Sequence, residues 1–155
     1  MVSKVVREGL MRLSRVRCTG VPLFSVLMVA CSSPTGPTVY DVLAHQAIWA
    51  AQHLGTYSFT FQVWASTYPI ECPTAEWQIT VQQGTATGSA CVATGQATST
   101  PRVTIDSLFA DALAAASAQR LSTISFDPVR GYPTEIAYAG PPDAAPVFRV
   151  TSLRP

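Results

Sequence analysis

The chain has 155 residues and a mass of 16.5 kDa, and its 10 Lys and Arg against 9 Asp and Glu give a formal net charge of +1. This length fits one domain of ordinary size, and a 48% share of apolar residues excludes a wholly disordered chain. The near-neutral net charge gives no excess of basic residues for binding the phosphate backbone, so no nucleic-acid partner is expected.

The first 30 residues have the pattern of a secretory signal. Five of the ten basic residues lie among the first 17, where Glu8 is the one acidic residue. Residues 21–30 are then uncharged and mostly apolar, a run half as long as the about 20 residues that a membrane-spanning helix needs. A basic head, a short apolar run and a small final residue predict a signal peptide over 1–30, starting at Met1 or Met11.

The end of the apolar run resembles the lipobox of bacterial lipoproteins. In Leu27-Met-Val-Ala30-Cys31 a small residue precedes the cysteine, which in those proteins is diacylated and becomes the mature N-terminus. An ordinary signal peptide with a chance cysteine is the alternative. Residues 31–38 are rich in Pro, Gly, Ser and Thr, which predicts a flexible tether after the lipidated Cys31.

The resemblance also implies a location. Lipid on Cys31 would anchor an exported protein to a cell membrane, and two or more acyl chains hold such an anchor stably. Ser32 follows in place of the Asp that retains lipoproteins at the inner membrane, so the outer membrane is favoured where the cell has one.

The cysteines divide between the signal and the exported part. Cys18 lies in the basic head and Cys31 takes the lipid, which leaves Cys72 and Cys91. Export permits a disulfide between these two, closing a loop of about 20 residues and contributing about 3 kcal/mol in the chain-entropy model. Two reduced, buried thiols are the main alternative. A redox pair or a metal site is disfavoured by the wide spacing and the small number of ligands.

Two helices are predicted from apolar periodicity and capping signals. The first covers 40–54 and stops at Gly55. The second begins after the cap Thr104, with Asp106 in its first turn, and ends at Arg120. The predicted buried stripes are Tyr40, Leu43, Ala47, Ala51 and Leu54 in the first helix, and Ile105, Leu108, Phe109, Ala112, Leu113 and Ala116 in the second.

Alternating apolar and polar residues predict strands between and after the helices. Strands are expected at 57–63 and 76–82, then a weaker one at 88–93 after a turn at Gln83-Gly84. Three more are expected at 121–126, 134–138 and 147–153. The predicted fold is a single α+β domain over 39–155, an antiparallel sheet of about six strands with two helices packed on one face. The outward positions are polar and uncharged: Ser58, Thr60, Gln62, Gln78, Thr80 and Gln82.

Five segments together resemble a known family. They are Tyr57-Ser-Phe59, the cysteine-bearing loop, 77–84, Ile105-Asp-Ser-Leu-Phe109 and Phe126-Asp-Pro-Val-Arg-Gly-Tyr-Pro-Thr-Glu-Ile136. The set is similar to the small bacterial lipoproteins gathered as domain of unknown function 6174, although Phe126 stands where that family more often has Tyr. The resemblance covers residues 40–153 and implies no known activity.

The sequence contains few of the residues and motifs that catalysis requires. His45 and His53 both fall on the first predicted helix, where Asp41 and His45 form at most a common i, i+4 pair. Motifs for a nucleophile elbow, a zinc protease, a phosphate loop or a dinucleotide site are missing from the sequence. No catalytic, cofactor or metal residue is therefore assigned. Four acidic residues are the candidates for glycoside-type chemistry: Glu71, Glu76, Asp127 and Glu135.

These patterns favour a membrane-anchored lipoprotein whose domain is non-catalytic and binds an envelope protein or acts as an accessory factor. An envelope hydrolase that uses carboxylates, or a small protein inhibitor, are the alternatives. Trp49, Trp64 and Trp77 are expected in the core or at a sheet edge rather than as a ligand cage. The sequence predicts no oligomeric state.

Overall fold

The computed structural model describes residues 36–64, 71–141 and 145–155. The predicted signal peptide, Cys31 and residues 31–35 of the tether lie outside them. The elements are α1 (Val39–Ala50), β1 (Thr56–Trp64), β2 (Glu76–Gln82), β3 (Thr85–Cys91), α2 (Ile105–Ser117), β4 (Leu121–Phe126), β5 (Pro133–Tyr138) and β6 (Val147–Arg154).

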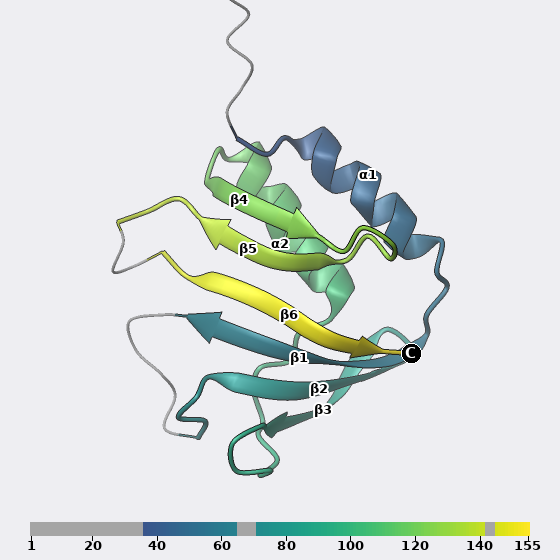
Figure 1. Cartoon of the computed structure of the whole chain (residues 1–155), viewed down its shortest axis with the longest axis vertical. Coiled ribbons are helices and arrows are strands. Elements are labelled where there is room, and N and C mark those ends of the chain that lie inside the picture. Colours follow the sequence, from purple (N-terminus) through teal and green to yellow (C-terminus); the bar gives the residue numbers. More distant parts are fainter. Residues whose placement is uncertain (1–35, 65–70, 142–144) are drawn as a thin grey trace, which may run out of the picture. The chain divides into compact units, whose positions relative to one another are not determined.

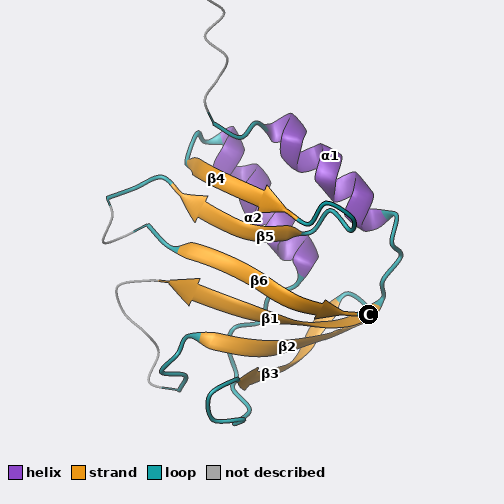
Figure 2. Cartoon of the chain, in the orientation of Figure 1, coloured by secondary structure: helices purple, strands orange, loops and turns teal. Residues whose placement is uncertain are grey.

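The strands form one sheet in the order β3-β2-β1-β6-β5-β4, and every neighbouring pair is antiparallel (Figure 1). In Figure 2, α2 lies behind β4 and β5, and α1 lies beside α2. One face of the sheet is therefore covered by α2 directly, while α1 packs mainly on α2 and reaches the strands through His45, which stacks on Phe126, and Trp49, which meets Tyr57 edge-on. This arrangement confirms the predicted α+β class.

The core fills the space between the covered face and α2. Residues on this face line up across the strands, because cross-strand partners in register point to the same side of the sheet. One such row is Ile124, Ile136, Phe148 and Val63, and the next is Val150, Phe61, Trp77 and Cys91. Helix α2 contributes the fully buried Ile105, Leu108 and Phe109.

The hairpin between β2 and β3 is tighter than predicted. Gln83 and Gly84 both have positive φ, 51° and 73°, and Gln82 pairs with Thr85 directly across the turn. Two left-handed central residues give the twist that a two-residue hairpin loop requires. The chain therefore re-enters the sheet at Thr85, three residues before the predicted strand start.

Helix α2 buries Ile105, Leu108, Phe109 and Ala112 of its predicted stripe and also Ala115, while the predicted Leu113 and Ala116 are partly buried. The helix ends three residues before Arg120. Gln119 adopts φ 55°, the left-handed position that usually holds glycine. The Gln119 N–H donates to the carbonyl of Ala116 at 3.1 Å, and the Arg120 N–H donates to that of Ala115 at 2.8 Å. This Schellman-type ending stops the helix at Ser117, although no glycine marks the helix end in the sequence.

The prediction for α1 is wrong in both its end and its buried side. The helix ends at Ala50, and His53, with φ 52°, turns the chain before Gly55. Val42 and Trp49 are the buried residues, whereas Tyr40 is 83% exposed. The Trp49 indole donates to Asp106 Oδ1 at 3.2 Å, so burying the largest side chain against α2 decides which side faces inward.

Candidate functional site

The Asp41–His45 pair is structural. The Asp41 carboxylate accepts hydrogen bonds from the N–H and hydroxyl of Thr38 at 2.8 and 2.7 Å, closing a capping box at the start of α1. These bonds, from the hydroxyl first, lower the pKa of Asp41. The His45 ring donates through Nδ1 to the Asp41 backbone carbonyl at 2.9 Å and stacks on Phe126 with centroids 3.9 Å apart. His45 thus joins α1 to the end of β4.

The candidate carboxylates are not brought together as a catalytic pair. Asp127 Oδ1 accepts from the backbone N–H groups of Val129 and Arg130 at 2.9 and 2.7 Å, which fixes the turn between β4 and β5. Glu135 and Glu76 share one row of the sheet, separated by Arg149 and Gln62. Three strand spacings place their backbones about 14 Å apart, and the Glu135 carboxylate is paired with Arg149 between them.

Glu71 is exposed in the turn before β2. Among the described residues, no three His, Cys, Asp or Glu side chains gather closely enough to hold a metal ion.

The three tryptophans lie in different places. Trp49 and Trp77 are each 4% exposed and belong to the core. Trp64 is half-buried at the end of β1 on the opposite face of the sheet. Trp49 and Trp77 match the expected core role, whereas Trp64 lies on a central strand rather than at a sheet edge.

The side of the sheet away from α2 forms a polar surface, here called the open sheet face. The register places all six predicted outward residues on it, and strands β5 and β6 extend it. Thr60 donates its hydroxyl to Gln78 Oε1 at 3.4 Å across β1 and β2. Its polar and aromatic residues are Ser58, Thr60, Gln62, Trp64, Glu76, Gln78, Thr80, Gln82, Glu135, Arg149 and Thr151, and the apolar Ala137 and Val147 lie in the row of Trp64.

Arg149 is held in place at the middle of this face. Its Nη2 and Nε both donate to Glu135 Oε2, at 2.7 and 3.3 Å. Its guanidinium carbon lies 4.3 Å from the centroid of the Trp64 ring. Each contact contributes up to about 1 kcal/mol at such an exposed position, so their main effect is to fix the direction of the guanidinium.

Arg149 and Glu135 also belong to the open sheet face, although neither was among the predicted outward residues. The signal was present, because alternation in 134–138 and 147–153 assigns both residues to the polar side. The face was read from β1 and β2 alone, and strands distant in sequence complete it. It is therefore polar with a paired charge at its centre, rather than uncharged throughout.

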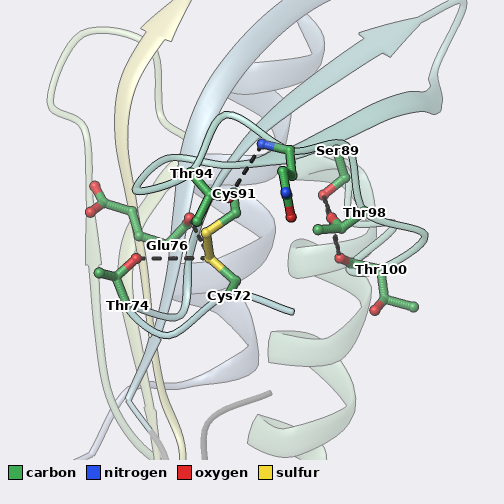
Figure 3. The surroundings of a disulfide bond; sticks show 9 residues. Cys72, Thr74, Glu76, Ser89, Cys91, Thr94, Thr98 and Thr100 are labelled. Carbon is green, nitrogen blue, oxygen red and sulfur yellow. Dashed lines mark hydrogen bonds between the residues drawn. A yellow bond between two sulfur atoms is a disulfide. The ribbon is translucent and has the colours of Figure 1, made fainter. Parts of the chain in front are cut away.

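The cysteines close the β2–β3 edge of the domain (Figure 3). Cys72 and Cys91 form a disulfide, with Cα atoms 5.4 Å apart, and neither residue is exposed. The Ser89 and Thr98 hydroxyls lie 2.9 Å apart, and Thr98 donates to the Thr100 carbonyl at 2.7 Å. These hydrogen bonds hold the segment after β3 against the sheet. The disulfide gives the two cysteines a structural role.

The fold and its surfaces define a small α+β domain with a helix-covered face and an open polar face. A family model described as "Family of unknown function (DUF6174)" matches residues 41–145, and the chain belongs to this family. The match confirms the family resemblance noted in the sequence. No curated protein and no solved structure is detectably similar to the chain. Within the described part of the chain, no helix has the length and apolar character needed to span a membrane.

Proposed function

We propose that the protein is an exported lipoprotein, anchored through Cys31, whose domain binds a protein of the cell envelope without catalysing a reaction. The Ala30-Cys31 junction after a basic head and a ten-residue apolar run supports the anchor. The open sheet face supports the binding role, because it presents ordered polar groups on a rigid sheet.

The chemistry of this face indicates the kind of partner. Hydroxyl and amide side chains such as Thr80 and Gln78 exchange hydrogen bonds with water for bonds with a protein at little desolvation cost. Arg149 adds a guanidinium whose direction is already fixed by Glu135 and Trp64, which reduces the entropy lost on binding. A partner with exposed carbonyl or carboxylate oxygens opposite Arg149 suits this arrangement.

A non-catalytic role is supported by the way the candidate groups are used. Asp127 is engaged in a turn, His45 stacks on Phe126, and Glu135 is paired with Arg149. Each of these side chains has a local structural task.

Crosslinking in intact cells, followed by purification of the lipidated protein, tests the proposal. The variants Gln78→Ala/Thr80→Ala and Arg149→Ala should lose a partner that the wild type captures. The melting temperature should be nearly unchanged in the first variant and lowered by several degrees in the second, which loses the two contacts of Arg149 but stays folded. Ser117→Ala, exposed at the end of α2, is the matched control and should retain it. Equal capture by all variants would contradict binding through this face. Turnover of an envelope substrate that Glu135→Gln abolishes in a folded protein would contradict the non-catalytic role.

A further inference from the structure

The side of α1 that faces away from α2 is apolar and exposed. This outer face of α1 is formed by Tyr40, Leu43, Ala44, Ala47 and Ile48. Tyr40 is 83% exposed, Leu43 45% and Ile48 41%. Helical spacing places all five residues opposite the buried Val42 and Trp49. The exposed side of a surface helix usually carries charged residues, so its apolar composition marks an interaction surface.

The turn between β4 and β5 extends this surface. Gly131 brings the turn against α1, because a Cβ built at Gly131 would lie 2.7 Å from the His45 carbonyl oxygen and 2.8 Å from Ile48 Cβ. Val129, two residues earlier in the same turn, is 77% exposed. The exposed apolar side chains of α1 and Val129 therefore come from two elements in direct contact.

We infer that the outer face of α1, with Val129, rests on the lipid bilayer that carries the anchor; this inference depends on the proposed lipidation of Cys31. Residues 31–38 span at most about 28 Å when fully extended, and the apolar face begins two residues later at Tyr40. So short a tether holds α1 at high effective concentration beside the bilayer, where a weak apolar affinity suffices for docking.

The composition and size of the face favour a bilayer over a second copy of the chain. A helix of 12 residues is about 18 Å long and 10 Å wide, so its outer side offers about 200–300 Å². A stable protein interface needs about 800 Å² from each partner. A bilayer needs no shape complementarity, and a tyrosine such as Tyr40 suits the boundary between water and lipid.

Fluorescence quenching on vesicles tests this inference with the full, processed protein. Ala47→Cys places a thiol at the centre of the outer face, and Gln78→Cys places one on the open sheet face as the matched control. Each purified lipoprotein is labelled with an environment-sensitive dye and reconstituted on phosphatidylcholine vesicles that contain brominated lipid. The Ala47 label should shift to the blue and be quenched, whereas the Gln78 label should show neither change. Introducing Tyr40→Glu and Leu43→Glu together into the Ala47→Cys protein should remove both the blue shift and the quenching, while the protein still floats with the vesicles.

The readouts separate this inference from the proposed function. Flotation and the mass of the N-terminal peptide report the anchor, whereas quenching reports the contact of α1 with lipid. Protein that floats with equal quenching at both labels would overturn the bilayer contact and leave the anchor intact. A blue shift at the Ala47 label without quenching by lipid would indicate that a protein covers this face, and it would also overturn the bilayer contact. Protein that carries no acyl chains and does not float would overturn both.

Discussion

Gly131 illustrates how a single backbone position can fix the packing of two elements. Its φ of 77° lies in the left-handed region, and the backbone of α1 approaches it so closely that a Cβ has no room. Gly84 has a similar φ of 73° and open space around it. The two glycines therefore separate the cost of the backbone conformation from the cost of contact with α1.

Gly131→Ala should destabilise the domain far more than Gly84→Ala. Alanine at positive φ costs about 1 kcal/mol at either site, and at Gly131 displacement of α1 adds about 2 kcal/mol or more. Urea unfolding of the two variants and the wild type measures the difference. Equal losses at the two positions would show that the turn does not depend on close contact with α1.

Tyr57 shows a second effect at the residue scale. Its side chain is 2% exposed, and its hydroxyl accepts a hydrogen bond from the Ile105 N–H at 3.1 Å at the start of α2. Burial, the dominant cause, raises the pKa of Tyr57 from 10.0 to about 12, because the charged phenolate is poorly solvated there.

The free energy of unfolding should therefore fall in alkali. A group whose pKa is raised in the folded state contributes stability that is complete below its unfolded pKa and is lost as the pH rises through the folded one. For Tyr57 this window runs from pH 10 to about 12. Tyr57→Phe should cost about 1–2 kcal/mol at pH 7, because it leaves a buried N–H without an acceptor.

The same variant should show a shallower alkaline fall, measured by urea unfolding at several pH values. Burial also raises the pKa of Tyr132 and Tyr138, so part of the slope should remain. Identical slopes for the variant and the wild type would contradict the assignment to Tyr57.

At the scale of whole elements, the strands were more predictable than the first helix. Alternation located β2 and β4 to the residue, because each strand has one buried side and one solvated side. Helix α1 has apolar residues on both sides. Periodicity alone therefore could not show whether the side with Tyr40 or the side with Trp49 is buried. The choice depends on α2 and Gly131, which are more than 50 residues away in sequence.

The ends of the elements were harder to predict than their centres. Both helices are followed by a non-glycine residue with positive φ, His53 after α1 and Gln119 after α2. Such residues carry no stop signal of their own, because a non-glycine residue rarely adopts positive φ. The hydrogen bonds at these positions are local, from the His53 N–H to the Ala50 carbonyl and from the Gln119 N–H to the Ala116 carbonyl. The open sheet face was predicted only in part, because β6 pairs with β1, and β5 with β6, only in the folded sheet.

The disulfide is an element-scale constraint on the β2–β3 edge. Cys72 and Cys91 are 19 residues apart, so their bond should contribute about 3 kcal/mol by restricting the unfolded chain. Reduction of the wild type should lower the free energy of unfolding by this amount without changing the packed volume. Unfolding with and without reductant measures the effect, and peptide mapping without reductant should find the two cysteines linked. Equal stability under both conditions, or recovery of both as free thiols from a quenched native sample, would contradict the prediction.

At the scale of the whole molecule, two exposed surfaces of opposite character belong to different layers. The open sheet face is polar and lies on the side of the sheet away from α2, while the outer face of α1 is apolar and closest in sequence to the tether. A domain held to a bilayer by α1 would keep the open sheet face available for a partner. This arrangement, with α1 on the bilayer and the open sheet face free for a partner, depends on the lipid anchor.

Cys31→Ala should remove the anchor. The variant lacks the thiol that would carry the lipid, so the protein should either leave the membrane fraction or remain as a longer, uncleaved precursor. Cys18→Ala is the matched control, because Cys18 follows Arg17 in the basic head and should be lost with the signal. Fractionation of cells, gel mobility and the mass of the N-terminal peptide measure the outcome. A Cys31→Ala protein that fractionates and migrates like the wild type would rule out lipidation at Cys31, and with it the tethered arrangement of the domain.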